Sequence, residues 1–159
     1  MRWRPMRSDD LDPVHRLSRR AHKDYPEGRE VFAERLALFP TGCRVLARAG
    51  EIGGYMICHP WVLAMAPPLN VLLGQLPAPL DCLHLHDIVI APAWRGAGSA
   101  RRGLVWLERL SVDMGLPTIS LVAVAGTDER WRRLGFVPAA RQDAATYGPG
   151  AMCMTKTIP

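Results

Sequence analysis

The chain has 159 residues, a formal net charge of +5, and 48% hydrophobic against 22% charged residues. That length is enough for one domain with a buried core, and the composition excludes a disordered or membrane-embedded chain. Its 14 glycines and 14 prolines follow no period, which excludes a collagen-like protein. The basic residues form no stripe interleaved with aromatic residues, so we expect no nucleic-acid partner.

The cysteine pattern and the apolar stretches indicate a reducing compartment. The four cysteines lie far apart and form no CxxC pair. We therefore expect reduced, buried thiols rather than a disulfide framework or a zinc ribbon. Residues 1–5 are not followed by the apolar run of a signal peptide, and the most apolar stretch, residues 52–73, is interrupted by prolines. We expect a cytoplasmic protein without a membrane partner.

The first half of the chain predicts a strand, two helices and a hairpin. Residues 3–6 form a short strand, and Ser8-Asp9-Asp10 begins a helix that ends before Pro26-Glu27-Gly28. A second helix covers residues 30–39. Strands over residues 44–48 and 51–59 flank the tight Ala49-Gly50 turn. A long proline-containing loop over residues 60–80 follows, and loops of this length inside compact domains are often functional.

The second half predicts strands alternating with helices. We expect strands over residues 83–90, 118–124, 136–139 and 152–158, and helices over residues 98–114 and 126–133. This order is typical of an α/β (α+β) fold whose central sheet is mixed, mostly antiparallel and twisted, with helices on both faces. We expect one domain over residues 1–159.

The glycine-rich turn Arg95-Gly96-Ala97-Gly98-Ser99-Ala100 follows a predicted strand and opens a helix. Such a turn leaves the first amides of the helix unpaired, and the helix dipole adds positive potential, which favours a pyrophosphate ligand. The alternative is an ordinary turn that needs glycine for its backbone angles. A P-loop would need Gly-Lys-Ser/Thr, and a Rossmann turn would follow a strand near the N-terminus; neither is present.

Three motifs occur in a fixed order: Ile90-Ala91-Pro92, the turn Arg95–Ala100, and Trp131-Arg132-Arg133-Leu134-Gly135-Phe136. Together they resemble the GNAT superfamily of N-acetyltransferases, over essentially the whole chain. The resemblance implies a GNAT fold and acetyl-CoA as co-substrate, with no metal. It implies that the amides of residues 97–100 hold the pyrophosphate and that residues 88–90 pair with the pantetheine arm. The implied cofactor-binding residues are Ile88, Val89, Ile90, Arg95, Gly96, Ala97, Gly98, Ser99, Ala100 and Trp131.

The pair His84-Leu85-His86 lies on the strand before the turn. Strand alternation places both imidazoles on one face and Asp87 on the other, where we interpret Asp87 as structural. The two histidines could ligate a metal, act as general base and relay, or be structural. Their spacing from Arg95 resembles that of the arylalkylamine (serotonin) N-acetyltransferase branch, which implies that His84 and His86 serve as base and relay for an amine.

Trp131 departs from the family, in which this position is commonly the Tyr that protonates the CoA thiolate. An indole N–H is not a useful acid. Either the thiolate leaves unprotonated, or Tyr147 is the acid; the alternative for Tyr147 is packing. Tyr25 and Trp61 are predicted to line the pocket of an aromatic or apolar amine, although both could equally be packing residues.

The sequence therefore predicts an N-acetyltransferase that moves acetyl from acetyl-CoA to a primary amine of a small molecule. Attack is expected to be direct, in a ternary complex, in a monomer or homodimer. Three alternatives remain open. They are a non-catalytic acyl-CoA-binding module, an acetyltransferase acting on a protein amine, and a metal-binding protein that uses His84 and His86.

Overall fold

The computed structural model describes residues 1–140 and 144–159 of the chain. In these residues seven strands form one sheet in the order β1-β2-β3-β4-β5-β7-β6. Strands β4 and β5 are parallel, and the other neighbouring strands are antiparallel. The strands are β1 Arg2–Pro5, β2 Cys43–Arg48, β3 Glu51–Trp61, β4 Cys82–Ile90, β5 Thr118–Ala123, β6 Val137–Pro138 and β7 Met152–Thr157. This is the mixed, mostly antiparallel sheet that the sequence predicts.

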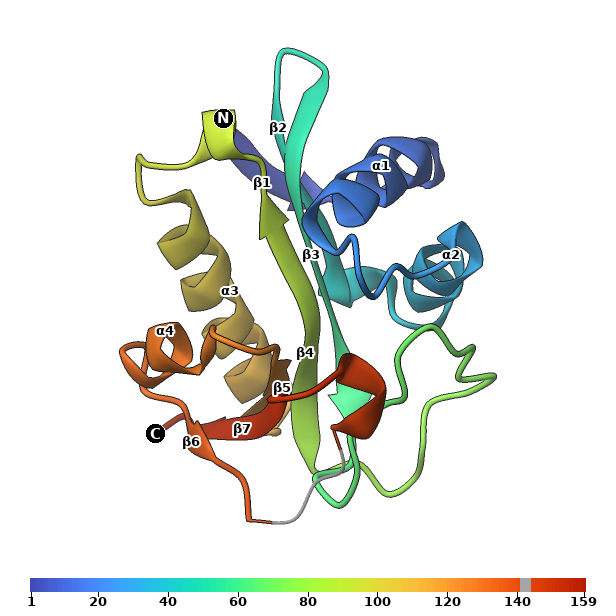
Figure 1. Cartoon of the computed structure of the whole chain (residues 1–159). Helices are drawn as coiled ribbons and strands as arrows, with labels where there is room; N and C mark the ends of the chain where they lie inside the picture. Colours follow the sequence, from blue (N-terminus) through green and yellow to red (C-terminus); the bar gives the residue numbers. More distant parts are fainter. Residues whose placement is uncertain (141–143) are drawn as a thin grey trace.

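Helices cover both faces of the sheet (Figure 1). They are α1 Leu11–Ala21, α2 Arg29–Leu38, α3 Ser99–Asp113 and α4 Asp128–Arg132. Helices α1 and α2 lie on one face, where Val14 and Phe32 pack in a cluster with Tyr55. Helices α3 and α4 lie on the other, where Leu107 packs with Leu121. Each fully buried side chain of this kind contributes about 1.5–3 kcal/mol relative to an exposed one.

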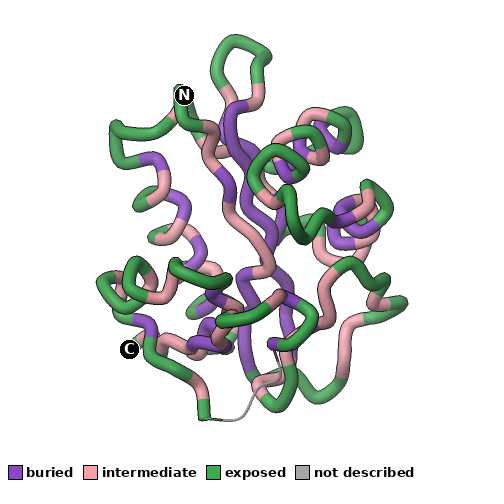
Figure 2. Tube along the Cα trace, viewed as in Figure 1, coloured by how far each residue is buried: buried purple, intermediate pink, exposed green. Residues whose placement is uncertain are grey.

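Burial is highest along the central strands and lowest in the connecting loops (Figure 2). All four cysteines are buried, as predicted. Among the described residues, no helix has both the length and the apolar character needed to cross a bilayer.

Strand β3 is longer than predicted and contains Pro60. We expected the strand to end at His59, because proline lacks the amide needed in a strand that has two neighbours. Strand β2, however, pairs with β3 only as far as Ile57, whereas Pro60 pairs with Leu83 of β4 on the other side. Beyond Ile57, β3 therefore has one neighbour, and the missing amide of Pro60 interrupts no ladder.

A β-bulge in β4 overturns the predicted orientation of Asp87. Pairing between β3 and β4 jumps from Ile57↔Asp87 to Cys58↔Leu85, so that His86 has no partner on β3. The extra residue shifts the alternation of side chains that follow it. Asp87 consequently lies on the α1 side of the sheet, with His86, and the prediction that it faces the opposite side is wrong.

Strands β4 and β5 part at the same place. They pair only between Leu83↔Ile119 and Leu85↔Leu121, although β4 continues to Ile90. Past Leu85 the edge of β4 that faces β5 is therefore unpaired. This opening between two parallel strands is where the site is built.

Candidate functional site

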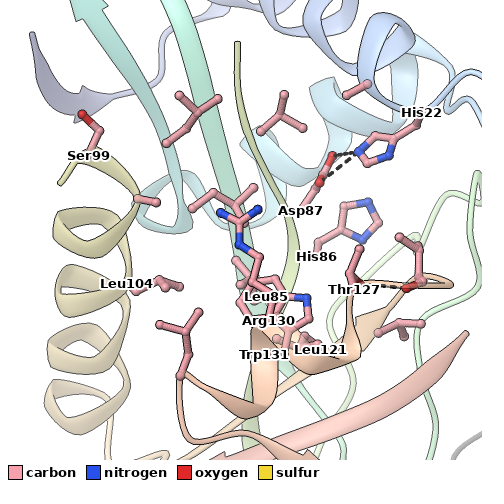
Figure 3. A pocket seen from close by; sticks show the side chains of 18 of the residues that line it. His22, Leu85, His86, Asp87, Ser99, Leu104, Leu121, Thr127, Arg130 and Trp131 are labelled. Carbon is pink, nitrogen blue, oxygen red and sulfur yellow. Dashed lines mark hydrogen bonds and ion pairs between the residues drawn. The ribbon is translucent and has the colours of Figure 1, made fainter. Parts of the chain in front are cut away.

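A cavity of about 700 Å³ occupies the opening between β4 and β5. Its wall includes the end of α1, the unpaired part of β4, the start of α3, and α4 (Figure 3). Ser99 and Leu104 of α3 lie on one side of the close-up, and His22 and His86 lie on the other. One cavity thus contacts both the glycine-rich turn and the histidine-bearing strand.

The glycine-rich turn holds its backbone in an unusual conformation. Gly96, Ala97 and Gly98 have φ angles of +89°, +47° and +69°, and a positive φ is uncommon for alanine. In the described part of the chain, the amides of these three residues donate to no protein acceptor. Gly96, Gly98, Ser99 and Ala100 line the cavity, but Ala97 does not. The turn therefore offers donors to a ligand at the start of α3.

Side chains from outside the turn brace it. The Arg102 guanidinium donates to the Ala97 carbonyl and, at 3.0 Å, to the Ser99 hydroxyl. The Trp3 indole of β1 donates to the Ser99 carbonyl at 2.8 Å. These contacts fix the turn before any ligand binds, so its donors are preorganised.

Four arginines make this side of the cavity cationic. Arg95 donates to the carbonyl of Ile90 at 3.1 Å, which places it at the end of β4. The Arg130 side chain reaches from α4 into the cavity (Figure 3). Arg101 and Arg133 complete the set that lines the cavity. Guanidinium groups match phosphate oxygens in geometry and charge, so this side suits a polyphosphate ligand.

Glu27 and His86 form a buried pair on the other side of the cavity. The His86 Nε2 lies 2.7 Å from the Glu27 Oε1, and their side chains are 1% and 6% exposed. Burial by itself would raise the pKa of Glu27, but the charge and hydrogen bond of His86 outweigh it and lower that pKa. The backbone N–H of Asn70 also donates to the Glu27 Oε2, at 2.9 Å. The pair holds a carboxylate against an imidazole inside an apolar wall.

Sequence reasoning missed Glu27 as a site residue. It used Glu27 only as part of the Pro26-Glu27-Gly28 helix break, and 59 positions separate Glu27 from His86. Two residues this far apart in the sequence form no local motif, so the sequence pattern does not predict their contact. The long loop before β4 supplies a further partner in Asn70. That this loop is functional stays a prediction.

His22, Asp87 and Tyr55 form a second polar group beside the cavity. The Nε2 of His22 lies 3.1 and 3.0 Å from the two carboxylate oxygens of Asp87 (Figure 3). The Tyr55 hydroxyl donates to the same carboxylate. Hydrogen bonding to Asp87 raises the pKa of His22, although burial opposes this. Burial raises the pKa of Tyr55, so the phenol keeps its proton and donates it. The group ties the end of α1 to β4.

His84 lies behind the cavity wall rather than in it. Its side chain is on the same side of β4 as His86, as predicted, but His84 is buried and does not line the cavity. The His84 Nδ1 is 2.9 Å from the Ser120 hydroxyl of β5, and burial lowers the pKa of His84. Among the described residues, no group of three His, Cys, Asp or Glu side chains is arranged to hold a metal ion.

The other predicted site residues are divided between the cavity and its surroundings. Tyr25, Trp131 and Tyr147 line it, whereas Trp61 does not and donates from its indole to the Met65 carbonyl at 2.8 Å. The Tyr147 hydroxyl donates to the Pro67 carbonyl at 2.7 Å, and burial raises the pKa of Tyr147. Trp131 packs edge-on against Phe136.

Solved structures with similar backbones identify the fold. Ard1 from Thermoplasma volcanium matches with a TM-score of 0.74 and 13% identity, over 99% of this chain and 97% of that chain. GphF, a GNAT-like decarboxylase in complex with isobutyryl-CoA, matches with a TM-score of 0.75 and 18% identity over 100% of both chains. N-acetylglutamate synthase from Neisseria gonorrhoeae, complexed with coenzyme A and N-acetyl-glutamate, matches with a TM-score of 0.75 and 14% identity. The match covers 99% of this chain and 35% of that chain.

The chain therefore has the GNAT fold, as the motifs predict. No family model and no curated protein sequence matches it. The resemblance to the arylalkylamine branch stays a prediction.

Because hydrogen bonding to Asp87 raises the pKa of His22, protonated His22 stabilises the folded protein. The contribution is fully present below the pKa of an unfolded histidine, about 6.5, and is lost as the pH rises through the higher folded pKa. We expect the free energy of unfolding of the wild type, minus that of His22→Gln, to be largest below about pH 6.5. Urea denaturation across the neutral range measures it, with His15→Gln as control. A difference that does not change with pH would contradict the assignment.

Proposed function

We propose that this chain is an acetyl-CoA-dependent N-acetyltransferase that acetylates a primary amine of a small molecule. The observation that carries the proposal is one cavity with two chemically opposite sides. One side presents unpaired amides and four arginines, and the other presents the Glu27–His86 pair and Asp87. The first suits the phosphates of an acyl-CoA, and the second suits a cationic amine and its proton.

The acyl-CoA would bind along the unpaired part of β4. The amides of residues 97–100 would receive the pyrophosphate, with Arg95 and Gly96 beside them. Ile88, Val89 and Ile90 line the cavity and have no strand partner on the β5 side, so their backbone is available to the amides of the pantetheine arm. Trp131 would contact the same arm from α4.

The Glu27–His86 pair would accept the proton that an ammonium must lose before it can attack. An alkylammonium has a pKa of about 10.4, so a base is needed near neutral pH. The neutral nitrogen then attacks the thioester carbonyl carbon, and the C–S bond breaks with its electron pair moving to sulfur. The second N–H proton of the tetrahedral intermediate leaves to the thiolate or to solvent. Glu27 replaces His84 as the group that takes the proton from the substrate, because the His86 Nε2 is hydrogen-bonded to Glu27 and the His86 Nδ1 is buried. His86 supports the Glu27 carboxylate, and His84 becomes a relay behind it.

The acceptor side is apolar apart from these groups. Tyr25, Leu69 and Tyr147 line the cavity together with Glu27, which supports an amine with an apolar or aromatic body. Trp61 lies outside the cavity and would shape it only through its neighbours. Among the similar structures are the ribosomal-protein-S18-alanine N-acetyltransferase from Escherichia coli and N-acetylglutamate synthase, so a protein amine and an amino acid belong in the test.

A turnover screen tests the function. Wild-type protein with acetyl-CoA should release free thiol when an arylalkylamine is added, and more slowly with amino acids, polyamines or a peptide N-terminus. We expect His86→Gln to lower kcat by about 10²-fold or more, the usual contribution of a general base, without weakening acetyl-CoA binding. His15→Gln is the matched control. Binding of acetyl-CoA without turnover on any amine would instead support a non-catalytic binding module.

Gly98→Asp should abolish acetyl-CoA binding. The change places a carboxylate at the turn, next to the expected pyrophosphate, where the added Cβ meets nothing closer than Arg102 at 3.7 Å. Gly98→Asn has the same shape without the charge and should bind more tightly than Gly98→Asp. Gly50→Asp, at a similar positive φ in the β2–β3 turn, controls for backbone strain. Isothermal calorimetry that finds unchanged affinity in folded Gly98→Asp would place the phosphates elsewhere.

Tyr147 stays the candidate acid for the departing thiolate. Its hydroxyl now donates to Pro67, so protonation of the thiolate would require that hydrogen bond to break. If Tyr147 is the acid, Tyr147→Phe lowers kcat by about 10²-fold or more. An unchanged kcat, with a lower unfolding free energy, would mean that the thiolate leaves unprotonated and that Tyr147 holds the loop.

A further inference from the structure

Three imidazoles, those of His59, His84 and His86, pack together, and the last of them is the partner of Glu27. His59 of β3 is the direct cross-strand partner of His84. The ring centroids of His59 and His84 are 5.6 Å apart, those of His59 and His86 are 6.2 Å apart, and those of His84 and His86 are 6.5 Å apart. We call these three residues the histidine cluster. Sequence analysis singled out His84 and His86 but gave His59 no role.

Each ring of the cluster keeps one buried nitrogen that no described protein group contacts through a hydrogen bond. These atoms are the His59 Nε2, the His84 Nε2 and the His86 Nδ1. The other nitrogen of each ring has a partner: the Pro60 carbonyl for His59, the Ser120 hydroxyl for His84 and the Glu27 carboxylate for His86. Buried polar atoms in native proteins are almost always satisfied, by protein or by ordered water.

The partners determine which nitrogens carry protons. A carbonyl only accepts, so the His59 Nδ1 must be the N–H, and the Nε2 of the neutral ring is then a bare lone pair. The Glu27 carboxylate likewise requires N–H at the His86 Nε2, which leaves the Nδ1 bare. The cluster thus contains two buried lone pairs that each need a donor.

We propose that the histidine cluster holds one buried water, and that His59 acts through this water as a positioning residue for His86; the second part rests on the proposed function. The water donates one O–H to the His59 Nε2 and the other to the His86 Nδ1. Its oxygen accepts the N–H of the His84 Nε2. This arrangement gives the water three protein partners, which is typical of buried waters.

The tautomer of His84 follows from the same count. With N–H at Nδ1, the His84 Nε2 would be a third bare lone pair, and a single water has only two protons to give. With N–H at Nε2, the Nδ1 accepts from the Ser120 hydroxyl, whose oxygen lies 3.5 Å from the Cys82 thiol. The chain of donors then runs from Cys82 through Ser120 and His84 to the water, and every hydrogen is used once.

The spacing of the rings favours water over a metal ion. Rings that each place one nitrogen about 2.9 Å from a common oxygen have centroids roughly 5.7–6.6 Å apart, for angles of about 90–110°. Around a zinc ion, with nitrogens at about 2.1 Å, the centroids would be roughly 5.2 Å apart at a tetrahedral angle. The observed separations of 6.2 and 6.5 Å lie in the range for the water, that of 5.6 Å lies at its lower edge, and all three exceed the zinc value.

The water accommodates both protonation states of His86. When His86 gains a proton at Nδ1, the new N–H donates to the water oxygen, which already accepts from His84. The water keeps one O–H on His59 and turns the other away from His86. The hydrogen-bond network therefore follows the proton without any movement of the rings, so His86 keeps its place against Glu27 throughout.

The surroundings of His59 and His84 disfavour a proton on either ring. Burial, with the charges of His86 and Arg35, lowers the pKa of His59 to about 3. Burial and the charges of its neighbours also lower the pKa of His84, and of the three rings only that of His86 is hydrogen-bonded to Glu27. Among the described residues, Glu27 contacts His86 and the charge of Arg35 of α2 acts on His59 and His84. The Cys82 thiol of β4 reaches the cluster only through the Ser120 hydroxyl.

The test reads the tautomers directly, in full-length protein labelled with ¹⁵N at the histidine rings. Long-range proton–nitrogen correlation spectra at neutral pH should show N–H at Nδ1 in His59 and at Nε2 in His84 and His86. In His59→Phe, which removes the acceptor but keeps a ring, the water is lost and His84 should populate both tautomers, because the Ser120 hydroxyl can accept from Nδ1 as well as donate to it. His59→Gln, whose amide oxygen can accept from the water, should restore the single tautomer. Circular dichroism and acetyl-CoA affinity establish that both variants are folded.

Turnover supplies a second readout. We expect His59→Phe to lower kcat and shift its pH profile, by less than the roughly 10²-fold cost of removing the base itself, with the acetyl-CoA dissociation constant unchanged. His59→Gln should recover most of this loss, and His15→Gln should show none.

Three results would overturn the proposal: N–H at the Nδ1 of His84 in the wild type, an unchanged His84 tautomer in folded His59→Phe, or stoichiometric zinc in the protein by elemental analysis. If no amine is acetylated, the proposed function fails, but the wild-type and His59→Phe spectra still decide whether the water is there.

Discussion

The bulge at His86 is the constraint on which the rest of the site depends. In a regular strand His86 and Asp87 would point to opposite faces, and the two carboxylate–imidazole pairs could not form on one side of the sheet. With the extra residue, both side chains meet the segment between α1 and α2, where His22 and Glu27 receive them. Pairing of β4 with β5 ends one residue earlier, at Leu85. The bulge thus coincides with both the two carboxylate–imidazole pairs and the cavity beside them.

Burying the carboxylates of Glu27 and Asp87 costs desolvation free energy, which their imidazole partners offset. A lone carboxylate in such surroundings would be neutralised, because desolvation disfavours its charged form. Glu27 and Asp87 each have an imidazole at hydrogen-bond distance, and Asp87 also receives the Tyr55 hydroxyl. The same contacts join the α1–α2 segment to β4. The stability of this part of the fold therefore depends on these two pairs.

Much of the site could be read from local pattern. The turn from Arg95 to Ala100 and the Trp131–Phe136 motif are contiguous, and a turn followed by a helix has the same geometry wherever it occurs. The alternation rule also placed His84 and His86 on one face correctly. It failed for Asp87, because a bulge depends on the register with a second strand, which one strand's residues do not encode. Likewise Pro60 could enter β3 only because β2 ends short of it.

The sequence by itself determined the element order, the two-faced sheet and the glycine-rich turn at the start of α3, because periodicity and glycine placement act over a few neighbouring residues. Only the tertiary structure decided which polar groups meet. Glu27 reaches His86 across 59 positions, and His59 joins the histidine cluster through pairing of β3 with β4. It also decided that His84 is shielded while His86 lines the cavity, since both lie on one face and differ only in what packs over them. Long-range contacts arise from packing and strand register, and neither leaves a local trace in the sequence.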